Sequence, residues 1–148
     1  MSLETITETG FTSAMLKKEV VFLIVEDDRG HYMLTRQCLR NADIENQIVW
    51  LQDGQQALNY LYGKGNPTTT GKKYIILLDI RMPKIDGIEV LETIKSCPEL
   101  MDISVIMLTT SEDQQIARKC YELGCEAHII KPPGHVLLKA ISRISQRI

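Results

Sequence analysis

Short runs of branched aliphatic residues recur along this chain, and each is followed by a longer stretch in which apolar residues are spaced three or four apart. Runs of that length and composition predict buried strands, whereas the wider spacing predicts helices with one apolar face. Strands that alternate with helices are typical of a parallel sheet covered on both faces. The predicted strands are Val20 to Glu26, Ile48 to Leu51, Tyr74 to Asp79, Val105 to Thr109 and Ala127 to Ile130.

Turn residues agree with five helical segments between and after these strands. Asp53-Gly54 precedes the second helix, Ser96-Cys97-Pro98 ends the third, and Gly124 follows the fourth, where a C-terminal glycine cap is expected. We therefore expect an α/β fold with a doubly wound, flavodoxin-like parallel sheet in the order 2-1-3-4-5, flanked by five helices. The residues at helical spacing are His31, Leu34 and Cys38; Ala57, Leu58 and Leu61; Ile88, Leu91 and Ile94; Ile116, Cys120 and Leu123; and Leu137, Ile141 and Ile144.

Two polar segments fall outside this pattern. Residues 1–17 are rich in Thr, Ser and Glu, and residues 63–73 combine Gly, Pro, Thr and Lys. Segments with so few apolar residues cannot offset the entropy that ordering costs. We expect both to be flexible, with a contact surface as the alternative, and we assign the folded domain to residues 18–148.

Carboxylates stand at the ends of two predicted strands. Asp79 follows an aliphatic run and precedes a turn with Pro and Asp-Gly, while Glu26 and Asp27 follow the first strand. Right-handed crossovers place the first and third strands side by side, so these three groups should converge at one edge of the sheet. Three like charges so close need a cation, and Mg²⁺, with Mn²⁺ as a second option, suits them. The alternative is that the acids only cap the next helix, as Asp28 is placed to do.

A hydroxyl and an ammonium group follow two other strands. Thr109 ends the fourth predicted strand, and Lys131 follows the fifth. Beside a metal-bound carboxylate, both can donate to the oxygens of an attached phosphoryl group. Taken singly, Thr109 is explained as a helix cap and Lys131 as a solvated charge.

Composition excludes several other classes of function. The chain has 148 residues and a formal net charge of −2, which fits one globular domain. Without a block of Lys and Arg, we expect neither nucleic acid nor membrane as a partner. The sequence contains neither an apolar run of membrane-spanning length nor a signal-peptide pattern, which predicts a cytoplasmic protein. The four cysteines lack metal-binding spacing and are expected to be small core residues.

As a set, these motifs resemble the receiver domain of two-component response regulators. The resemblance covers about residues 19–148. More narrowly, the stretch from Asn46 to Leu61 and the long loop after it are similar to stand-alone receivers that partner phytochrome-type histidine kinases. The family motifs are Val25-Glu26-Asp27-Asp28, Leu78-Asp79-Ile80-Arg81-Met82-Pro83 with Asp86-Gly87, Leu108-Thr109-Thr110, and Lys131-Pro132.

The resemblance implies a set of roles around one phosphoryl group. Asp79 is the implied acceptor of a phosphoryl group from a histidine kinase, and the Lys131-Pro132 bond is implied to be cis. His128 stands where receivers carry an aromatic residue that rotates inward together with the threonine hydroxyl; a half-buried histidine without a signalling role is the alternative. The implied metal ligands are Glu26, Asp27, Asp79 and the backbone carbonyl of Arg81. Thr109 and Lys131 are implied to bind the phosphoryl oxygens. The residues implied to set the lifetime of the phosphoryl group are Arg81, Thr110 and Ser111.

Three histidines or aromatics remain outside these roles. His31 lies one helical turn after the acidic cluster and could approach the pocket, but a lone helical histidine is more often a packing residue. His135 is expected at the surface, and Trp50 at an edge of the core.

The implied function is a signalling module that acts through a phosphorylation-dependent contact with a downstream protein, rather than a metabolic enzyme. A hydrolase of the aspartyl-phosphate type would need an acid two residues after Asp79, where Arg81 stands. A degenerate receiver that serves as a phosphorylation-independent scaffold is the other alternative. A homodimer through the helix after the fourth strand, the fifth strand and the last helix is also compatible with the mixed charge of that face. Its residues include Glu112, Arg118, Lys119, Tyr121, Glu122, Lys139 and Arg143.

Overall fold

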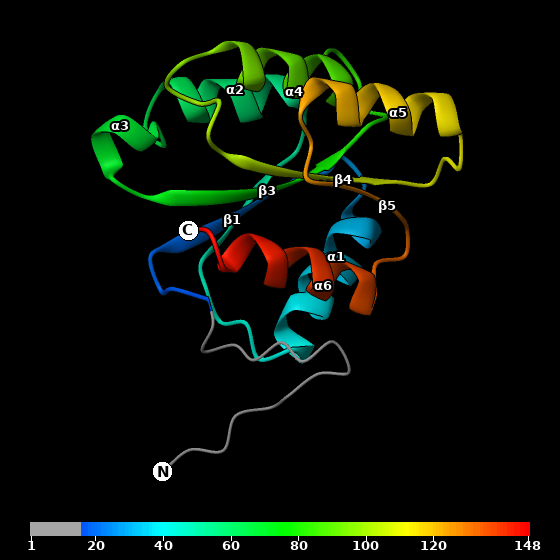
Figure 1. The fold of residues 1–148 in the computed structure, drawn as a ribbon, viewed down its shortest axis with the longest axis horizontal. Coiled ribbons are helices and arrows are strands. Elements are labelled where there is room, and N and C mark those ends of the chain that lie inside the picture. Colours follow the sequence, from blue (N-terminus) through cyan, green and yellow to red (C-terminus); the bar gives the residue numbers. More distant parts are fainter. Residues whose placement is uncertain (1–15) are drawn as a thin grey trace.

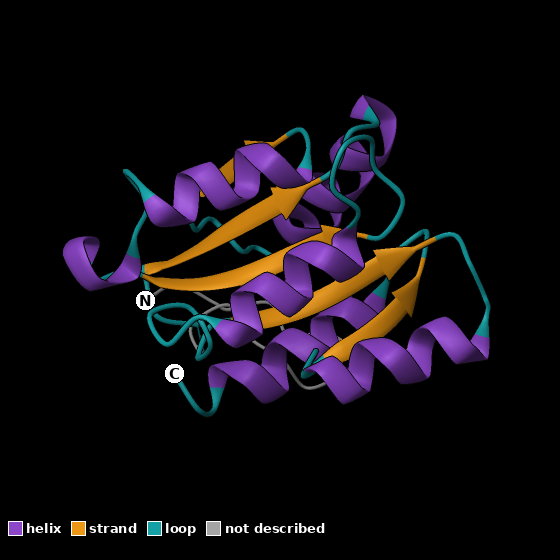
Figure 2. Cartoon of the chain, turned by 90° about the horizontal axis from the view of Figure 1, so that it is seen from above, coloured by secondary structure: helices purple, strands orange, loops and turns teal. Residues whose placement is uncertain are grey.

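The computed structural model describes residues 16–148 and contains one five-stranded parallel sheet (Figures 1 and 2). Its strands are β1 (Val20–Val25), β2 (Ile48–Leu51), β3 (Lys73–Asp79), β4 (Ser104–Thr109) and β5 (Ala127–Ile130). They lie in the order β2-β1-β3-β4-β5. All arrows in Figure 2 point the same way, so the carboxyl ends of the strands share one edge. This confirms the predicted flavodoxin-like sheet and its strand order.

Helices cover both faces of the sheet (Figure 1). They are α1 (Arg29–Asn41), α2 (Gly54–Tyr62), α3 (Pro67–Thr70), α4 (Gly87–Ser96), α5 (Gln114–Leu123) and α6 (His135–Ser145). Helices α2, α4 and α5 pack on one face, and α1 and α6 on the other. Among residues 16–148, none of the helices combines the length and apolarity that crossing a bilayer requires.

The central strands are buried on both faces, which explains their unbroken aliphatic runs. Every residue of β1 and β4 is buried, as is every residue of β3 except Lys73. Because side chains alternate along a strand, Leu23 packs in the core under α2, α4 and α5, whereas Phe22 packs in the core under α1 and α6. The two cores hold the sheet rigid, and with it the edge where the strands end.

Aspartate begins four of the helices. Asp28, Asp53, Asp86 and Asp113 each accept a hydrogen bond from a backbone N–H two or three residues later, at 2.8 to 2.9 Å. Such caps stabilise a helix by about 1 kcal/mol each. The bond from Gln56 N–H to the ionised Asp53 lowers the pKa of that carboxyl below its usual value. The caps therefore fix the residue at which each of these helices begins.

The structure corrects four details of the predicted elements. β1 ends at Val25 rather than Glu26, and β3 and β4 each begin one residue earlier than predicted. The residues predicted to form the apolar face of α1, which include Leu34, are not its most buried ones. Leu34 is 52% exposed, while Thr35 and Leu39 are buried. Leu34 instead lines surface pockets beside the chain that follows β5.

The five predicted helices are present, and residues 63–73, which were expected to be a loop, contain the additional short helix α3. Asn66 is buried and anchors the segment, since its side chain accepts a hydrogen bond from Thr68 N–H at 2.8 Å and donates to Glu99 Oε2 at 3.0 Å. Gly71 ends α3 with a φ of 68°, which glycine adopts without strain. The expected N-terminal extension lies almost entirely outside the described residues.

Gly87 marks a close approach between the end of β3 and the start of α4. Its N–H donates to the carbonyl of Ile80 at 2.8 Å. A Cβ atom at this position would lie 2.1 Å from the carbonyl oxygen of Asp79 and 2.8 Å from the Cα of Ile80. Only glycine permits this contact, which closes the loop that follows Asp79.

We expect Gly87→Ala to lower the free energy of unfolding by about 2 kcal/mol, because the backbone must move to accept the methyl group. Urea denaturation measures the loss. Gly134→Ala is the control, since a Cβ there meets no described atom within 4 Å; because Gly134 is the N-cap of α6, where glycine is preferred over alanine, the loss should be only about 0.5 to 1 kcal/mol. Equal losses in the two variants would contradict the steric explanation.

Candidate functional site

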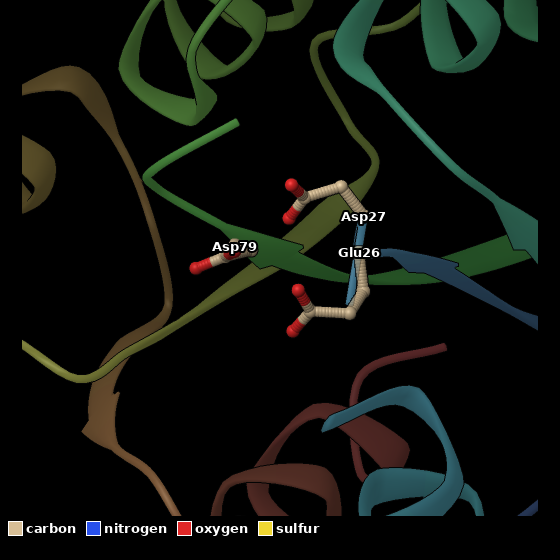
Figure 3. A group of neighbouring side chains, drawn as sticks. All are labelled: Glu26, Asp27 and Asp79. Carbon is tan, nitrogen blue, oxygen red and sulfur yellow. The ribbon is translucent and has the colours of Figure 1, made fainter. Parts of the chain in front are cut away.

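Three carboxylates meet at the carboxyl edge of the sheet, as predicted. Glu26 and Asp27 directly follow β1, and Asp79 is the last residue of β3. Each offers an oxygen, and these oxygens lie within 4.8 Å of one another. Figure 3 shows the side chains of Glu26 and Asp27 leaving the chain on opposite sides, with both carboxylates turned toward Asp79. Glu26 and Asp79 are buried, whereas Asp27 is exposed.

Lys131 brings a buried positive charge to this cluster. Its Nζ forms an ion pair with Glu26 Oε1 and lies 3.4 Å from Asp79 Oδ1. The backbone N–H of Lys131 donates to the carbonyl of Thr109 at 2.7 Å, which ties the end of β5 to the end of β4. The Lys131-Pro132 peptide bond is cis, as the resemblance implied.

The electrostatics of Glu26 indicate a site with excess negative charge. Burial raises the pKa of its carboxyl, and the nearby charge of Asp79 raises it further, while the hydrogen bond and charge of Lys131 oppose both effects. One ammonium group does not balance three carboxylates. Oxygen donors converging in this way are the ligands that hard divalent cations prefer. The cluster therefore fits a divalent metal ion.

The loop after β3 lies beside the carboxylates and is held in place by α2. Lys84 Nζ lies 3.4 Å from Asp53 Oδ2, and Lys84 itself has a φ of 68°. A Cβ on Gly54 would come within 2.6 Å of the Ile85 carbonyl oxygen, so the start of α2 packs directly against this loop. Arg81 is exposed and, with Asp27, lines an open groove that extends to α5.

The hydroxyl residues after β4 occupy different environments. Thr109 is 1% exposed, and its Oγ1 accepts a hydrogen bond from Ser111 N–H at 3.1 Å. Thr110 is exposed and lines a pocket of about 270 Å³ together with Lys131. Ser111 is half-buried, and its Oγ accepts from Asp113 N–H at 3.2 Å. Thr109 thus ends β4 at the edge that carries the carboxylates, and Thr110 lines a pocket there together with Lys131.

His128 is half-buried in β5, at the position expected for an inward-rotating aromatic. Its Nε2 is buried and has no hydrogen-bond partner among residues 16–148. Burial lowers the pKa of the imidazole below its usual value of 6.5. Its backbone N–H donates to the hydroxyl of Tyr121 on α5 at 3.1 Å. The structure places His128 in β5, which β4 separates from the strand of Asp79, and the His128 ring has a polar atom without a hydrogen-bond partner among the described residues.

Two contacts reach the site from outside the family motifs; the sequence indicated an approach of His31 only as the alternative to packing and did not indicate the contact of Trp50. His31 Nδ1 lies 3.2 Å from Lys131 Nζ, although a packing role was expected for it. Trp50 Nε1 donates to the backbone carbonyl of Glu26 at 2.8 Å, and its ring stacks on Tyr32 with centroids 4.2 Å apart. The position of His31 in the first turn of a helix capped by Asp28 was a usable signal, because that turn begins at the acidic cluster. No local signal identified the Trp50 contact.

Known proteins share this fold. The family model described as "Response regulator receiver domain" matches residues 22–142 of this chain. The chain belongs to the response regulator receiver family. Receiver domains are signalling modules rather than metabolic enzymes, as the sequence analysis expected.

Similar receivers include response regulators of phytochromes. The bacteriophytochrome response regulator AtBRR is 38% identical, with a TM-score of 0.72 over 82% of this chain and 89% of AtBRR. The response regulator Rcp1 of Synechocystis sp. is 35% identical over 75% of this chain and 76% of its own length. Its Mn²⁺-bound structure has a TM-score of 0.67, at 33% identity, over 85% of this chain and 88% of that one. The phosphorylated cyanobacterial phytochrome response regulator RcpA is 32% identical, with a TM-score of 0.68 over 83% and 88% of the two chains.

We expect Mg²⁺ or Mn²⁺ to raise the melting temperature of this receiver, because a bound cation offsets the repulsion among Glu26, Asp27 and Asp79. At a metal concentration of 100 times Kd, the gain is about 2.7 kcal/mol. Differential scanning calorimetry with and without metal measures it.

Asp27→Asn should remove most of this gain, and because it relieves part of the repulsion, the metal-free variant should be at least as stable as the metal-free wild type. Asp102→Asn, at an exposed acid outside the cluster, is the control and should keep the full gain. A metal-induced gain that survives in Asp27→Asn would argue against this cluster as the metal site.

Proposed function

We propose that residues 18–148 form a receiver that accepts a phosphoryl group on Asp79 from a histidine kinase and signals through a phosphorylation-dependent protein contact. The observation that carries the proposal is the convergence of Glu26, Asp27 and Asp79 with the buried ammonium of Lys131. A related response regulator, RcpA, has been crystallised in a phosphorylated form. Similarity to response regulators of phytochromes favours a phytochrome-type kinase as the donor.

In the proposed reaction an oxygen of Asp79 attacks the phosphorus of a phosphohistidine. The new P–O bond forms as the P–N bond breaks, and the electron pair of the P–N bond stays with the departing imidazole. Both the attacking carboxylate and the phosphoryl group are anionic, so the step needs positive charge and hydrogen-bond donors nearby. Lys131 supplies an ammonium, and Thr109 supplies a hydroxyl whose hydrogen is free because its oxygen accepts from Ser111 N–H.

Mg²⁺, with Mn²⁺ as a substitute, fits the carboxylates of Glu26, Asp27 and Asp79 and the backbone carbonyl of Arg81, and when bound it supplies charge neutralisation for the phosphoryl group. Glu26 and Asp27 then act as ligands, and Asp79 as ligand and nucleophile. Arg81, Thr110 and Ser111 are proposed to set the lifetime of the aspartyl phosphate, because each lies two residues or fewer from Asp79 or Thr109 along the chain.

The proposed output is a change of surface driven by Thr109. Its hydroxyl hydrogen donates to a phosphoryl oxygen, and a shift of Thr109 toward that oxygen carries the Ser111 N–H bonded to it, which moves the chain between β4 and α5. His128 lies on the neighbouring strand β5 and is proposed to follow this movement. The resulting contact, with a downstream protein or with a second copy, uses the face made of α5, β5 and α6. Nucleic acid and membrane are not proposed as partners.

We expect intact-mass spectrometry to show the gain of one phosphoryl group when the protein is mixed with Mg²⁺ and acetyl phosphate. Asp79→Asn should show none, because an amide is not a nucleophile for this transfer. Asp28→Asn is the matched control, since Asn also caps a helix, and it should be phosphorylated like the wild type. Failure of the wild type to gain the group, in a sample shown to bind Mg²⁺, would favour the scaffold alternative.

We expect an NMR titration of the His128 ring to give a pKa below 6.5 in the unphosphorylated protein, because burial disfavours the charged imidazole. By linkage, His128 then lowers the free energy of unfolding as the pH falls below about 6.5, where the unfolded chain binds the proton more readily. Phosphorylation should shift the ring resonances and this pKa. Identical titrations in the two states would rule out the proposed switch role of His128.

A further inference from the structure

We infer that His31 is a positioning residue for Lys131, and that it holds the ammonium group when a metal ion takes over the oxygens of Glu26. This inference rests on the proposed function, because it concerns the same phosphoryl site. It assigns a role to a residue outside the family motifs described above.

The buried ammonium group of Lys131 needs hydrogen-bond acceptors. Its ammonium group has three donors and no acceptor, and its side chain is only 6% exposed. Three acceptors surround Nζ, namely Glu26 Oε1 in an ion pair, Asp79 Oδ1 at 3.4 Å and His31 Nδ1 at 3.2 Å. Because an ammonium cannot accept, Nδ1 of His31 must accept this bond, which places the ring hydrogen on Nε2.

The local structure holds His31 in a position from which it reaches Lys131. The carboxylate of Asp28 accepts from His31 N–H at 2.9 Å and so fixes the first turn of α1. The imidazole then lies against Lys131 and lines the pocket of about 270 Å³ formed with Leu34, Thr35, Thr110, Pro132 and Pro133. The pocket walls are largely apolar. On this side of Lys131, the imidazole nitrogen of His31 is therefore the acceptor for the ammonium group.

Metal binding makes this acceptor important. Glu26 Oε1 contacts Lys131 Nζ, and the same carboxylate belongs to the cluster that fits a metal ion. A cation and an ammonium therefore compete for Glu26. An imidazole acceptor lets Lys131 shift away from Glu26 while keeping a hydrogen bond, and it adds no further negative charge that would itself compete for the metal. His31 Nδ1 is 3.8 Å from Glu26 Oε1, so the ammonium moves only a short way between the two acceptors.

The decisive experiment compares two substitutions by isothermal titration calorimetry of the full chain with Mg²⁺. His31→Phe keeps a ring and removes the acceptor, whereas His31→Asn removes the ring and keeps an acceptor atom bonded to Cγ. We expect the apparent Kd for Mg²⁺ to rise by up to about tenfold in His31→Phe, because the bond to His31 exists before metal binds but counts for more once Lys131 has given up Glu26 to the metal. In His31→Asn it should stay within about twofold of the wild type.

Other outcomes overturn the inference or the function on which it rests. Unchanged Mg²⁺ affinity in His31→Phe, or equal weakening in both variants, would show that the acceptor has no role. Absence of Mg²⁺ binding to the wild type would instead contradict the proposed metal site itself. The side chain of His31 is 41% exposed, so both variants should fold, and metal-free melting curves check this. Should His31→Phe unfold, His31→Leu provides a second variant without an acceptor, with the same expected rise.

Discussion

Two buried carboxylates share one buried ammonium, and the rest of the structure is organised around this arrangement. Glu26 and Asp79 each lie within reach of Lys131, and all three side chains are largely removed from solvent. Removing one partner from such a group strands an uncompensated charge at a cost of several kcal/mol. Glu26 follows β1, Asp79 ends β3 and Lys131 follows β5, so the observed strand order brings the three charges together. Electrostatics and sheet topology therefore support each other.

A parallel sheet suits this chemistry because it collects every strand-to-helix turn at one edge. Four aspartate caps begin helices that follow these turns, and the close approach at Gly87 closes the loop after Asp79. Lys84 and Asp53 connect that loop to α2. The acidic cluster is thus carried on turns that are fixed by caps and packing, although the turns themselves are at the surface. Rigid placement of like charges is what keeps the site ready for a cation.

Much of this arrangement was predictable from the sequence, because its signals are local. Aliphatic runs identified the strands, and the polar residues that end them identified Glu26, Asp27, Asp79, Thr109 and Lys131. What the sequence did not predict depends on contacts between distant residues. The Asn66 side chain meets Glu99 across 33 positions, Trp50 meets Glu26 across 24, and His31 meets Lys131 across 100. Such contacts follow from the packed fold, and composition alone made residues 63–73 resemble a flexible loop.

The same long-range contacts explain how the site can be both stable and responsive. Without a ligand, Lys131 satisfies the buried acids, and Ser111 N–H occupies the oxygen of Thr109. A cation at the cluster would use the Glu26 carboxylate that Lys131 contacts, so Lys131 would need another acceptor, and in the arrangement we propose this is His31. The proposed Thr109 hydroxyl bond is different, because its hydrogen would donate to a phosphoryl oxygen while its oxygen still accepts from Ser111 N–H. Because Ser111 belongs to the chain leading into α5, a shift of Thr109 toward that phosphoryl oxygen would be passed from the sheet edge to an exposed helix.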